Sequence, residues 1–268
     1  MLKKCQINLG GGSKWHKKQL DSFKMETKFE GLIKLLAEGL YSEPDTFVRE
    51  LIQNSHDSII RRRELEPDFR GRIDVAYDNT AKTITFTDDG IGMDRKDIRE
   101  FLSVIGSVGT AIAQEGGGKL SRDLIGQFGI GLLSAFVVAD KVYVDTLKVG
   151  ESEAFEWRNS GSQDCLLYSS DKTTVGSKIT VYVRDDYTYF LSESKLKSII
   201  IQYCDFLSVP ICLNGGDPVN TVEAPWSKTF ANYQEEIQEY THFIHHRYSD
   251  IAFDAFPILI DGEYDAYK

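Results

Sequence analysis

The stretch "DDGIGM", which runs from Asp88 to Met93, follows the strand-like run "KTITFT" directly. In a regular strand Asp88 emerges on the same face as Phe86, because side chains alternate between the two faces. A carboxylate there can accept hydrogen bonds from a ligand amino group. Gly90 and Gly92 allow the backbone to approach a ligand closely, and Met93 supplies a soft apolar wall. An exposed Asp-Gly turn explains the same stretch equally well, so other residues must decide.

The helical stretch "RELIQNSHDSII" offers a second set of candidate ligands. Glu50, Asn54 and Asp57 are spaced i, i+4 and i+7 and therefore share one helix face, while leucine and isoleucine cover the opposite face. Any amphipathic surface helix presents such a polar stripe to water. The residue types favour a function, because acid, amide and acid without a basic partner form a set of oxygen ligands suited to Mg²⁺.

The segment "GQFGIG", from Gly126 to Gly131, precedes the apolar run "LLSAFVVAD", which we expect to be a helix. Glycines before a helix leave backbone N–H groups free to bind phosphate oxygens. The chain has no Walker A loop, because Lys119 of "EGGGKLS" is followed by Leu120 rather than Ser or Thr. Ser177, just before the strand-like "KITVYV", adds a hydroxyl that means little alone.

Taken together and in this order, "ELIQNSHDSI", "DDGIGM", "GQFGIGLLSAF" and "GSKITVYV" resemble the split nucleotide-binding motifs of the GHKL ATPases. That group includes heat-shock protein 90 chaperones, gyrase-type topoisomerases, mismatch-repair MutL proteins and sensor histidine kinases. The motifs look most like the heat-shock protein 90 branch, in its bacterial HtpG-like form. The resemblance runs from about Met25 to Asn214. It continues weakly into "PW…PILIDGEY", which resembles the start of that family's middle domain.

The resemblance implies ATP/ADP and Mg²⁺ as cofactors and a role for each matching residue. Glu50 would be the catalytic general base that activates water, and Asn54 would bind Mg²⁺. Asp88 would accept the adenine amino group, within a network completed by three residues, namely Asp57, Gly92 and Ser177. Two apolar residues would pack against the base, namely Met93 and Phe136. The phosphates would be held by the glycine loop, namely Gly126, Gln127, Phe128, Gly129, Ile130 and Gly131.

The resemblance also implies motion and partners. Residues 107–125 would form a lid that closes over ATP. The full-length protein would act as a homodimer that assists unfolded client proteins, and the ATPase arginine of the middle domain would lie beyond Lys268. Two departures concern the lid: Phe101 stands where the family usually has Asn, and Ser107 lies near a usual Lys.

The order of helical and strand patterns along the chain predicts an α+β fold. We expect a two-layer sandwich of helices on a mainly antiparallel twisted sheet, which would position these residues. We expect helices at residues 46–65, 97–105 and 193–207, with Ser42 or Asp45 capping the first. Strands are expected in "GRIDVAYD", "KTITFTDD", "KVYVDTL", "EAFEWR" and "SKITVYV". We expect a flexible extension at 1–24, the GHKL domain at 25–214, a linker at 215–225 and the truncated start of a middle domain at 226–268.

Composition separates the remaining function classes. A net charge of −10 and a pI of about 5.1 argue against nucleic acid as a partner. No apolar run is long enough to cross a membrane, and four scattered cysteines fit a reducing compartment, so we expect a cytoplasmic protein. The alternatives are a GHKL module of a gyrase- or MutL-like enzyme, a sensor kinase, and a catalytically weak ATP-binding scaffold. A sensor kinase would need an upstream dimerisation helix with a phospho-acceptor His, and this sequence shows none. The "HFIHH" run at 242–246 indicates a helix surface rather than a metal site.

Overall fold

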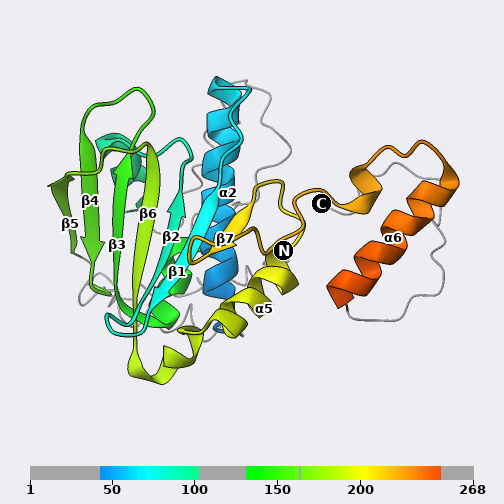
Figure 1. Ribbon diagram of the computed structural model, residues 1–268. Coiled ribbons are helices and arrows are strands. Elements are labelled where there is room, and N and C mark those ends of the chain that lie inside the picture. The colour runs from blue at the N-terminus through cyan, green and yellow to red at the C-terminus, as the bar shows by residue number, and fades with distance from the viewer. Residues whose placement is uncertain (1–42, 103–130, 163, 249–268) are drawn as a thin grey trace, which may run out of the picture.

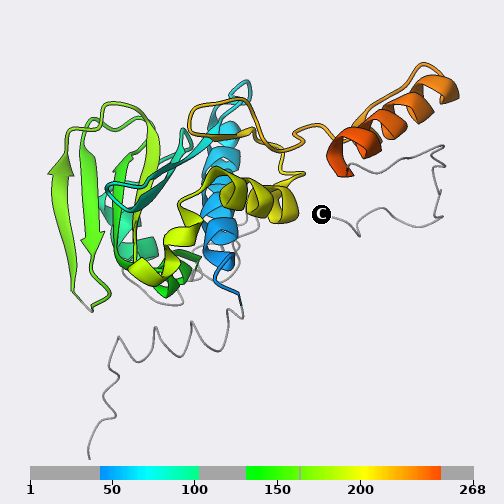
Figure 2. The same cartoon turned by 60° about the horizontal axis from the view of Figure 1, so that its bottom comes forward.

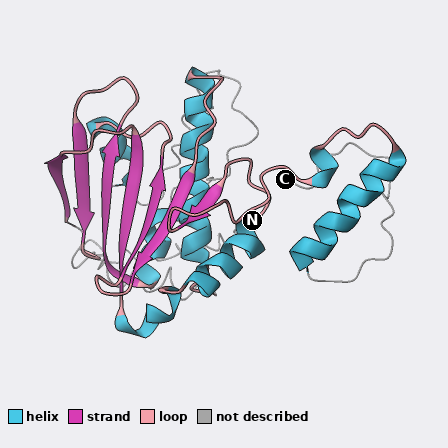
Figure 3. Ribbon diagram, viewed as in Figure 1, coloured by secondary structure: helices cyan, strands magenta, loops and turns pink. Residues whose placement is uncertain are grey.

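A computed structural model of the chain describes residues 43–102, 131–162 and 164–248, with side chains as far as His245. Within these residues, helices pack on one face of a seven-stranded sheet whose order is β5-β4-β3-β6-β2-β1-β7 (Figures 1 and 3). All neighbouring strands are antiparallel except β1 and β7, which are parallel. The predicted α+β sandwich on a mainly antiparallel sheet is confirmed.

The strands are β1 (Ile73–Asp78), β2 (Thr83–Asp88), β3 (Ala139–Leu147), β4 (Ala154–Asn159), β5 (Cys165–Ser170), β6 (Gly176–Val183) and β7 (Ile211–Leu213). The longer helices are α2 (Thr46–Leu65), α5 (Glu193–Cys204) and α6 (Tyr233–Tyr248). Short helical segments are α3 (Arg95–Asp97), η1 (Ile98–Leu102), η2 (Gly131–Val137), η3 (Asp185–Phe190) and η4 (Pro225–Ser227).

Helix α2 has the bounds expected from its pattern, and it is the element that carries most of the candidate residues. Its apolar residues recur at three- and four-residue steps and are buried against the sheet, while Arg62 and Arg63 complement the dipole at its last turn. The residue at the N-cap position is one of the two expected residues, Asp45, although its side chain does not cap the helix. Its carboxylate instead binds Lys195 Nζ of α5 at 2.6 Å. Ser42 lies outside the described residues.

The core lies between the sheet and the layer formed by α2 and α5, which lie on the same side of the sheet in both views (Figures 1 and 2). Phe47 of α2 meets Phe86 of β2 and Phe190 of η3 edge to face, with ring centroids 6.2 and 5.1 Å away. Each of these rings is almost fully buried, and burying a side chain of this size contributes about 2–3 kcal/mol. This packing fixes α2 across the strand that ends in Asp88.

Five elements differ from expectation. One is α5, which ends at Cys204 rather than at residue 207. "LLSAFVVAD" was expected to be a helix, but only a short 3-10 segment, η2, forms before β3 begins at Ala139. Two β-branched residues at its end favour the strand. The helix expected at 97–105 starts at Arg95 and continues as a π-helical turn to Leu102, after which the chain is not described. Strands β5 and β7 were not predicted.

Helix α6 lies apart from the sandwich in both views and is joined to it by the segment that follows β7 (Figures 1 and 2). Three aromatic rings gather at this connection: Phe206 lies 4.7 Å from Trp226 and 6.1 Å from Phe243, measured between centroids. The domain limits at 25–214, 215–225 and 226–268 stay predictions. Residues 1–24, and the strand expected in "AFPILIDGEY", lie outside the described residues.

Candidate functional site

Asp88 ends β2 with its carboxylate buried on the face of Ile84 and Phe86, as the alternation predicted. Its Oδ1 accepts hydrogen bonds from Ser58 Oγ of α2 at 3.2 Å and from the Gly90 backbone N–H at 2.9 Å. Burial raises the pKa of Asp88 to about 6, against the opposing effect of these two bonds and of a bond from the Ser177 backbone N–H. A buried carboxyl with a displaced pKa is typical of a binding site rather than of a surface turn.

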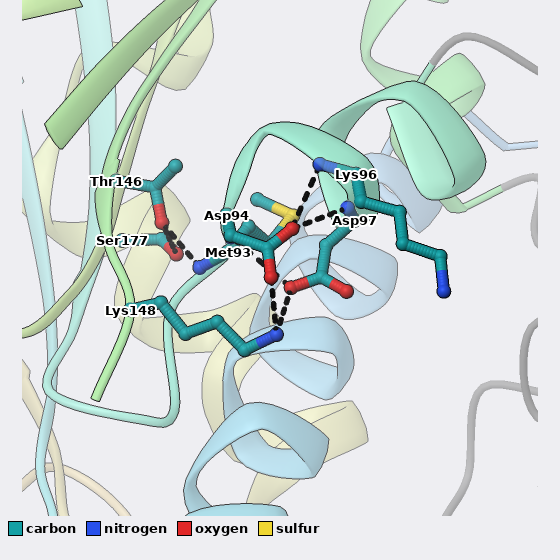
Figure 4. A network of polar contacts seen from close by, with 7 residues as sticks. All are labelled: Met93, Asp94, Lys96, Asp97, Thr146, Lys148 and Ser177. Carbon is teal, nitrogen blue, oxygen red and sulfur yellow. Dashed lines mark hydrogen bonds and ion pairs between the residues drawn. The ribbon is translucent and has the colours of Figure 1, made fainter. Parts of the chain in front are cut away.

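Asp88 belongs to a row of buried polar side chains that crosses three neighbouring strands. Asp88 of β2 is paired with Ser177 of β6, which is paired with Thr146 of β3. Residues paired in this way point to the same face. Thr146 and Ser177 place their hydroxyl oxygens 3.0 Å apart, and the Met93 backbone N–H donates to Thr146 Oγ1 at 2.8 Å (Figure 4). The row therefore links Asp88 to the backbone that carries Met93.

The loop after Asp88 requires a glycine at position 92. Its φ is +68°, a left-handed conformation that L side chains rarely adopt. A Cβ at this position would also lie 2.0 Å from the backbone carbonyl oxygen of Leu147. The loop after Asp88 is thus pressed against the end of β3, and Met93 packs its partly buried side chain against the core.

Asp89 differs from its neighbour. Asp89 is only partly buried, and its Oδ1 accepts a hydrogen bond from the Arg72 backbone N–H at 2.8 Å, next to the start of β1. Its carbonyl oxygen also accepts from Arg62 Nη1 at 2.7 Å. Of the two adjacent acids, Asp89 anchors the chain and Asp88 faces the interior.

The three candidates on α2 have different surroundings. Glu50 is partly exposed, and its Oε1 accepts from Arg49 Nη2 at 2.8 Å, a partner that the spacing analysis overlooked. Asp57 is buried, with its Oδ1 3.5 Å from His56 Nδ1. Between them, Asn54 faces the start of η2: a Cβ built on Gly131 would lie 2.9 Å from Asn54 Nδ2 and 3.3 Å from its Oδ1. Helix α2 and Gly131, the first residue of η2, therefore meet at Asn54.

The remaining predicted residues fall in three places. Phe136 lies in η2 and is buried in the core. Five glycine-loop residues lie outside the described residues, namely Gly126, Gln127, Phe128, Gly129 and Ile130, as does the expected lid at 107–125. Phe101 is described: its ring lies 5.9 Å from Arg61 Cζ of α2, a contact that an Asn side chain would not make.

Spacing alone missed Ser58, Thr146 and Lys148. Thr146 had a signal, because it is a hydroxyl residue in a strand position where Val142 and Val144 precede it on the buried face. Ser58 and Lys148 had none, since their roles depend on which segments lie side by side. Among the described residues, there is no cluster of three or more His, Cys, Asp and Glu that could hold a metal ion, and no helix is long and apolar enough to span a membrane.

Comparison with known proteins places the sequence of this chain in a family. Residues 41–175 match the family described as histidine kinase-, DNA gyrase B- and HSP90-like ATPases. The chain is 34% identical over 254 residues to the chaperone protein HtpG of Chromobacterium violaceum, which covers 85% of this chain and 40% of that protein. It is 34% identical over 266 residues to HtpG of Vibrio campbellii, covering 88% of this chain and 41% of that protein.

The HtpG of Psychromonas ingrahamii is 36% identical over 218 residues, which are 73% of this chain and 34% of that protein. The chain thus spans about two-fifths of the length of the curated relatives that it matches. Three of the four motifs that carried the resemblance lie within residues 41–175, and the fourth, "GSKITVYV", begins directly after them at Gly176. The chain belongs to the HtpG, or heat-shock protein 90, family and contains the ATPase region of that family.

Proposed function

We propose that this chain binds ATP and ADP with the adenine on Asp88, and that ATP hydrolysis at Glu50 drives a chaperone cycle. The buried carboxylate of Asp88 is the observation that supports this most directly. Above the pKa of about 6 it is an acceptor only. Adenine presents an amino donor where guanine presents a carbonyl acceptor, so an ionised Asp88 attracts adenine and repels guanine.

Residues around Asp88 complete the base site. The Ser177 and Thr146 hydroxyls lie beside it in the row, and Gly92 lets the loop lie flat against β3. Met93 and Phe136 would contact the purine through apolar atoms; in this structure Met93 is partly buried and Phe136 is buried in the core. Asp57 is buried on α2.

Side chains of α2 and the glycine segment would bind the phosphates and Mg²⁺. Oxygen donors suit this cation, and Asn54 offers its amide oxygen next to Gly131, where a backbone loop can come close. Mg²⁺ would supply charge neutralisation on the phosphates when bound. Glu50, one helical turn before Asn54, is the group that would take the proton from the attacking water. Arg49 occupies one oxygen of Glu50 in this structure and so competes with water for it.

For the whole protein, we extend the proposal to a cytoplasmic homodimer that binds unfolded client proteins. The support is the printed name of the relatives, chaperone protein HtpG, together with the identity over most of this chain. The net charge of −10 disfavours the alternative of a DNA-acting module.

A second candidate is an ATP-binding scaffold with little catalysis. Two observations favour it: the Arg49–Glu50 pair and the apolar Phe101, which contacts Arg61 where the family usually has an amide. The Glu50→Gln variant separates the two candidates. In the full-length protein, which would carry the middle-domain arginine, its ATP turnover falls below that of the wild type at equal ATP binding only if Glu50 is a general base.

Calorimetric titration with Mg-ADP and Mg-GDP tests the base site. We expect ADP to bind at least about a hundredfold more tightly than GDP, because buried hydrogen-bonding groups reject a ligand that leaves them unpaired. Asp88→Asn should abolish ADP binding. Asp89→Asn is the matched control: it removes the neighbouring charge but keeps an acceptor for the Arg72 N–H, and it should bind ADP like the wild type. Equal binding of ADP and GDP, or ADP binding by Asp88→Asn, would overturn the assignment.

A further inference from the structure

Lys148, the residue directly after β3, binds two carboxylates of the segment that follows Met93. Its Nζ donates to Asp94 Oδ2 and to Asp97 Oδ2, both at 2.7 Å (Figure 4). All three side chains are only partly exposed. One ammonium thus joins two acids, which is a tighter arrangement than an isolated surface ion pair.

The two acids already form the cap of α3. Asp94 Oδ1 accepts from the backbone N–H groups of Lys96 and Asp97, at 2.7 and 2.9 Å, and Asp97 Oδ2 accepts from the Asp94 N–H at 3.0 Å. This reciprocal capping box fixes the turn after Met93. The hydrogen bond from Lys148 also holds the pKa of Asp94 below its usual range. The two oxygens of Asp94 therefore have different partners: Oδ1 caps the backbone of α3, and Oδ2 binds Lys148.

Further contacts join the same two segments upstream of the capping box. The Val149 N–H donates to the Ile91 carbonyl at 2.9 Å, and the Met93 N–H donates to Thr146 Oγ1 at 2.8 Å. Gly92 lies between these two bonds, against the Leu147 carbonyl. The end of β3 thus contacts the loop from Ile91 to Asp97 along its length. The Lys148 ion pairs are the contacts nearest the C-terminal end of this loop, and they can be removed by one side-chain substitution.

We infer that Lys148 is a positioning residue for purine binding, which acts through Asp94 and Asp97 to hold Met93 against the base. This inference rests on the proposed function. Lys148 does not itself touch the base. It fixes the turn after Met93, while Thr146 connects the same backbone to Ser177 and so to the strand pair that carries Asp88. Loss of the ion pairs releases the turn after Met93 and leaves the buried residues Asp88, Ser177 and Thr146 in place.

Two measurements on the same variants test this role. Methyl-labelled methionine gives three signals, from Met1, Met25 and Met93, and the signal of Met93 is identified with Met93→Leu. In the nucleotide-free chain, Lys148→Gln should shift or broaden the Met93 signal and leave the other two unchanged. Calorimetry should show the ADP dissociation constant of Lys148→Gln raised by about three- to tenfold, the size expected when ion pairs of this exposure are lost.

Three further variants make the result specific. Lys148→Arg keeps both ion pairs and should restore the Met93 signal and ADP binding to within about twofold. Lys82→Gln removes a more exposed lysine–aspartate ion pair, with Asp185, at the opposite end of β2, and should change neither readout. Asp97→Asn keeps the backbone acceptor but loses the charge, so its effect and that of Lys148→Gln should not add in the double variant.

The outcomes separate the inference from the proposed function. Failure of the wild type to bind ADP would overturn the function and with it the purine role of Lys148, even if the Met93 signal moves. ADP binding by the wild type with unchanged Met93 signal and affinity in Lys148→Gln would overturn the inference alone. A lower melting temperature in Lys148→Gln with unchanged ADP affinity would also overturn it, by showing a purely structural role.

Discussion

The two ends of the proposed site are built differently. The purine end, defined here as Asp88, Ser177, Thr146 and Met93, is tied to backbone and buried hydroxyls across three strands. The phosphate end, defined as Glu50, Asn54 and Gly131, consists of two polar side chains of α2 and the first glycine of η2, which lies beside Asn54. The sheet register sets the first, whereas rotatable side chains make up the described part of the second.

This difference assigns different tasks to the two ends. A buried, hydrogen-bonded site loses little entropy on binding and strongly discriminates between ligands. A partly exposed site with side chains that can exchange partners suits a group that must release product and accept a new ligand. We therefore expect substitutions at the purine end to change the free energy of unfolding sharply, and those at the phosphate end to change it little.

Gly92→Ala should produce the largest effect. It combines a φ of +68° with a Cβ only 2.0 Å from the Leu147 carbonyl oxygen, so the backbone must move. We expect the free energy of unfolding to fall by about 3 kcal/mol or more. Chemical denaturation followed by circular dichroism measures it.

Two alanine variants calibrate that result. Gly150→Ala has a φ of +80° with no neighbouring atom within 4 Å, so it should cost only the backbone strain of about 1 kcal/mol. Gly131→Ala meets the rotatable Asn54 side chain and should also cost about 1 kcal/mol. Equal losses for Gly92→Ala and Gly131→Ala would contradict the contrast between the two ends.

Asp88→Asn should change how stability depends on pH. The pKa of Asp88 is raised by burial from 3.8 to about 6 in the folded chain, so between these values the folded state holds a proton that the unfolded state has lost. The wild type therefore loses stability as pH rises from about 4 to about 6, whereas Asp88→Asn lacks this loss. The difference in unfolding free energy between variant and wild type should shift by about 3 kcal/mol in favour of the variant over this range.

Denaturation curves of both proteins at several pH values measure this shift, and a pH-independent difference would contradict it. ADP affinity gives a second readout of the same group. Since the ionised carboxylate is the acceptor, affinity of the wild type should fall as pH drops below about 6.

Sequence patterns predicted the parts of the molecule that depend on local periodicity. The bounds of α2 follow from its apolar spacing, and the burial of Asp88 follows from strand alternation with Phe86. The order of four motifs carried the family resemblance, which the comparisons confirm. The roles of individual site residues stay proposals.

The features that sequence analysis missed depend on contacts between distant segments. β7 has only three residues and is identified by its parallel pairing with β1. β5 has three exposed apolar side chains in succession, Leu166, Leu167 and Tyr168, so it lacks the alternation that marks a half-buried strand. The bridge from Lys148 to Asp94 joins residues 54 positions apart, and only the sheet register brings them together.

Arg49→Gln should produce the smallest effect and so tests the phosphate end directly. The variant removes the hydrogen bond and ion pair to Glu50, but this pair is partly exposed and joins sequence neighbours on one helix. We expect the unfolding free energy to change by less than about 0.5 kcal/mol and ADP affinity by less than about twofold. Lys148→Gln is the matched comparison, because each variant removes one basic residue that acts next to one end: Arg49 binds Glu50, and Lys148 binds Asp94 and Asp97 after Met93. A loss of ADP affinity in Arg49→Gln as large as that in Lys148→Gln would mean that the side chains at both ends are equally fixed before the nucleotide binds. The contrast between the purine end and the phosphate end would then be wrong.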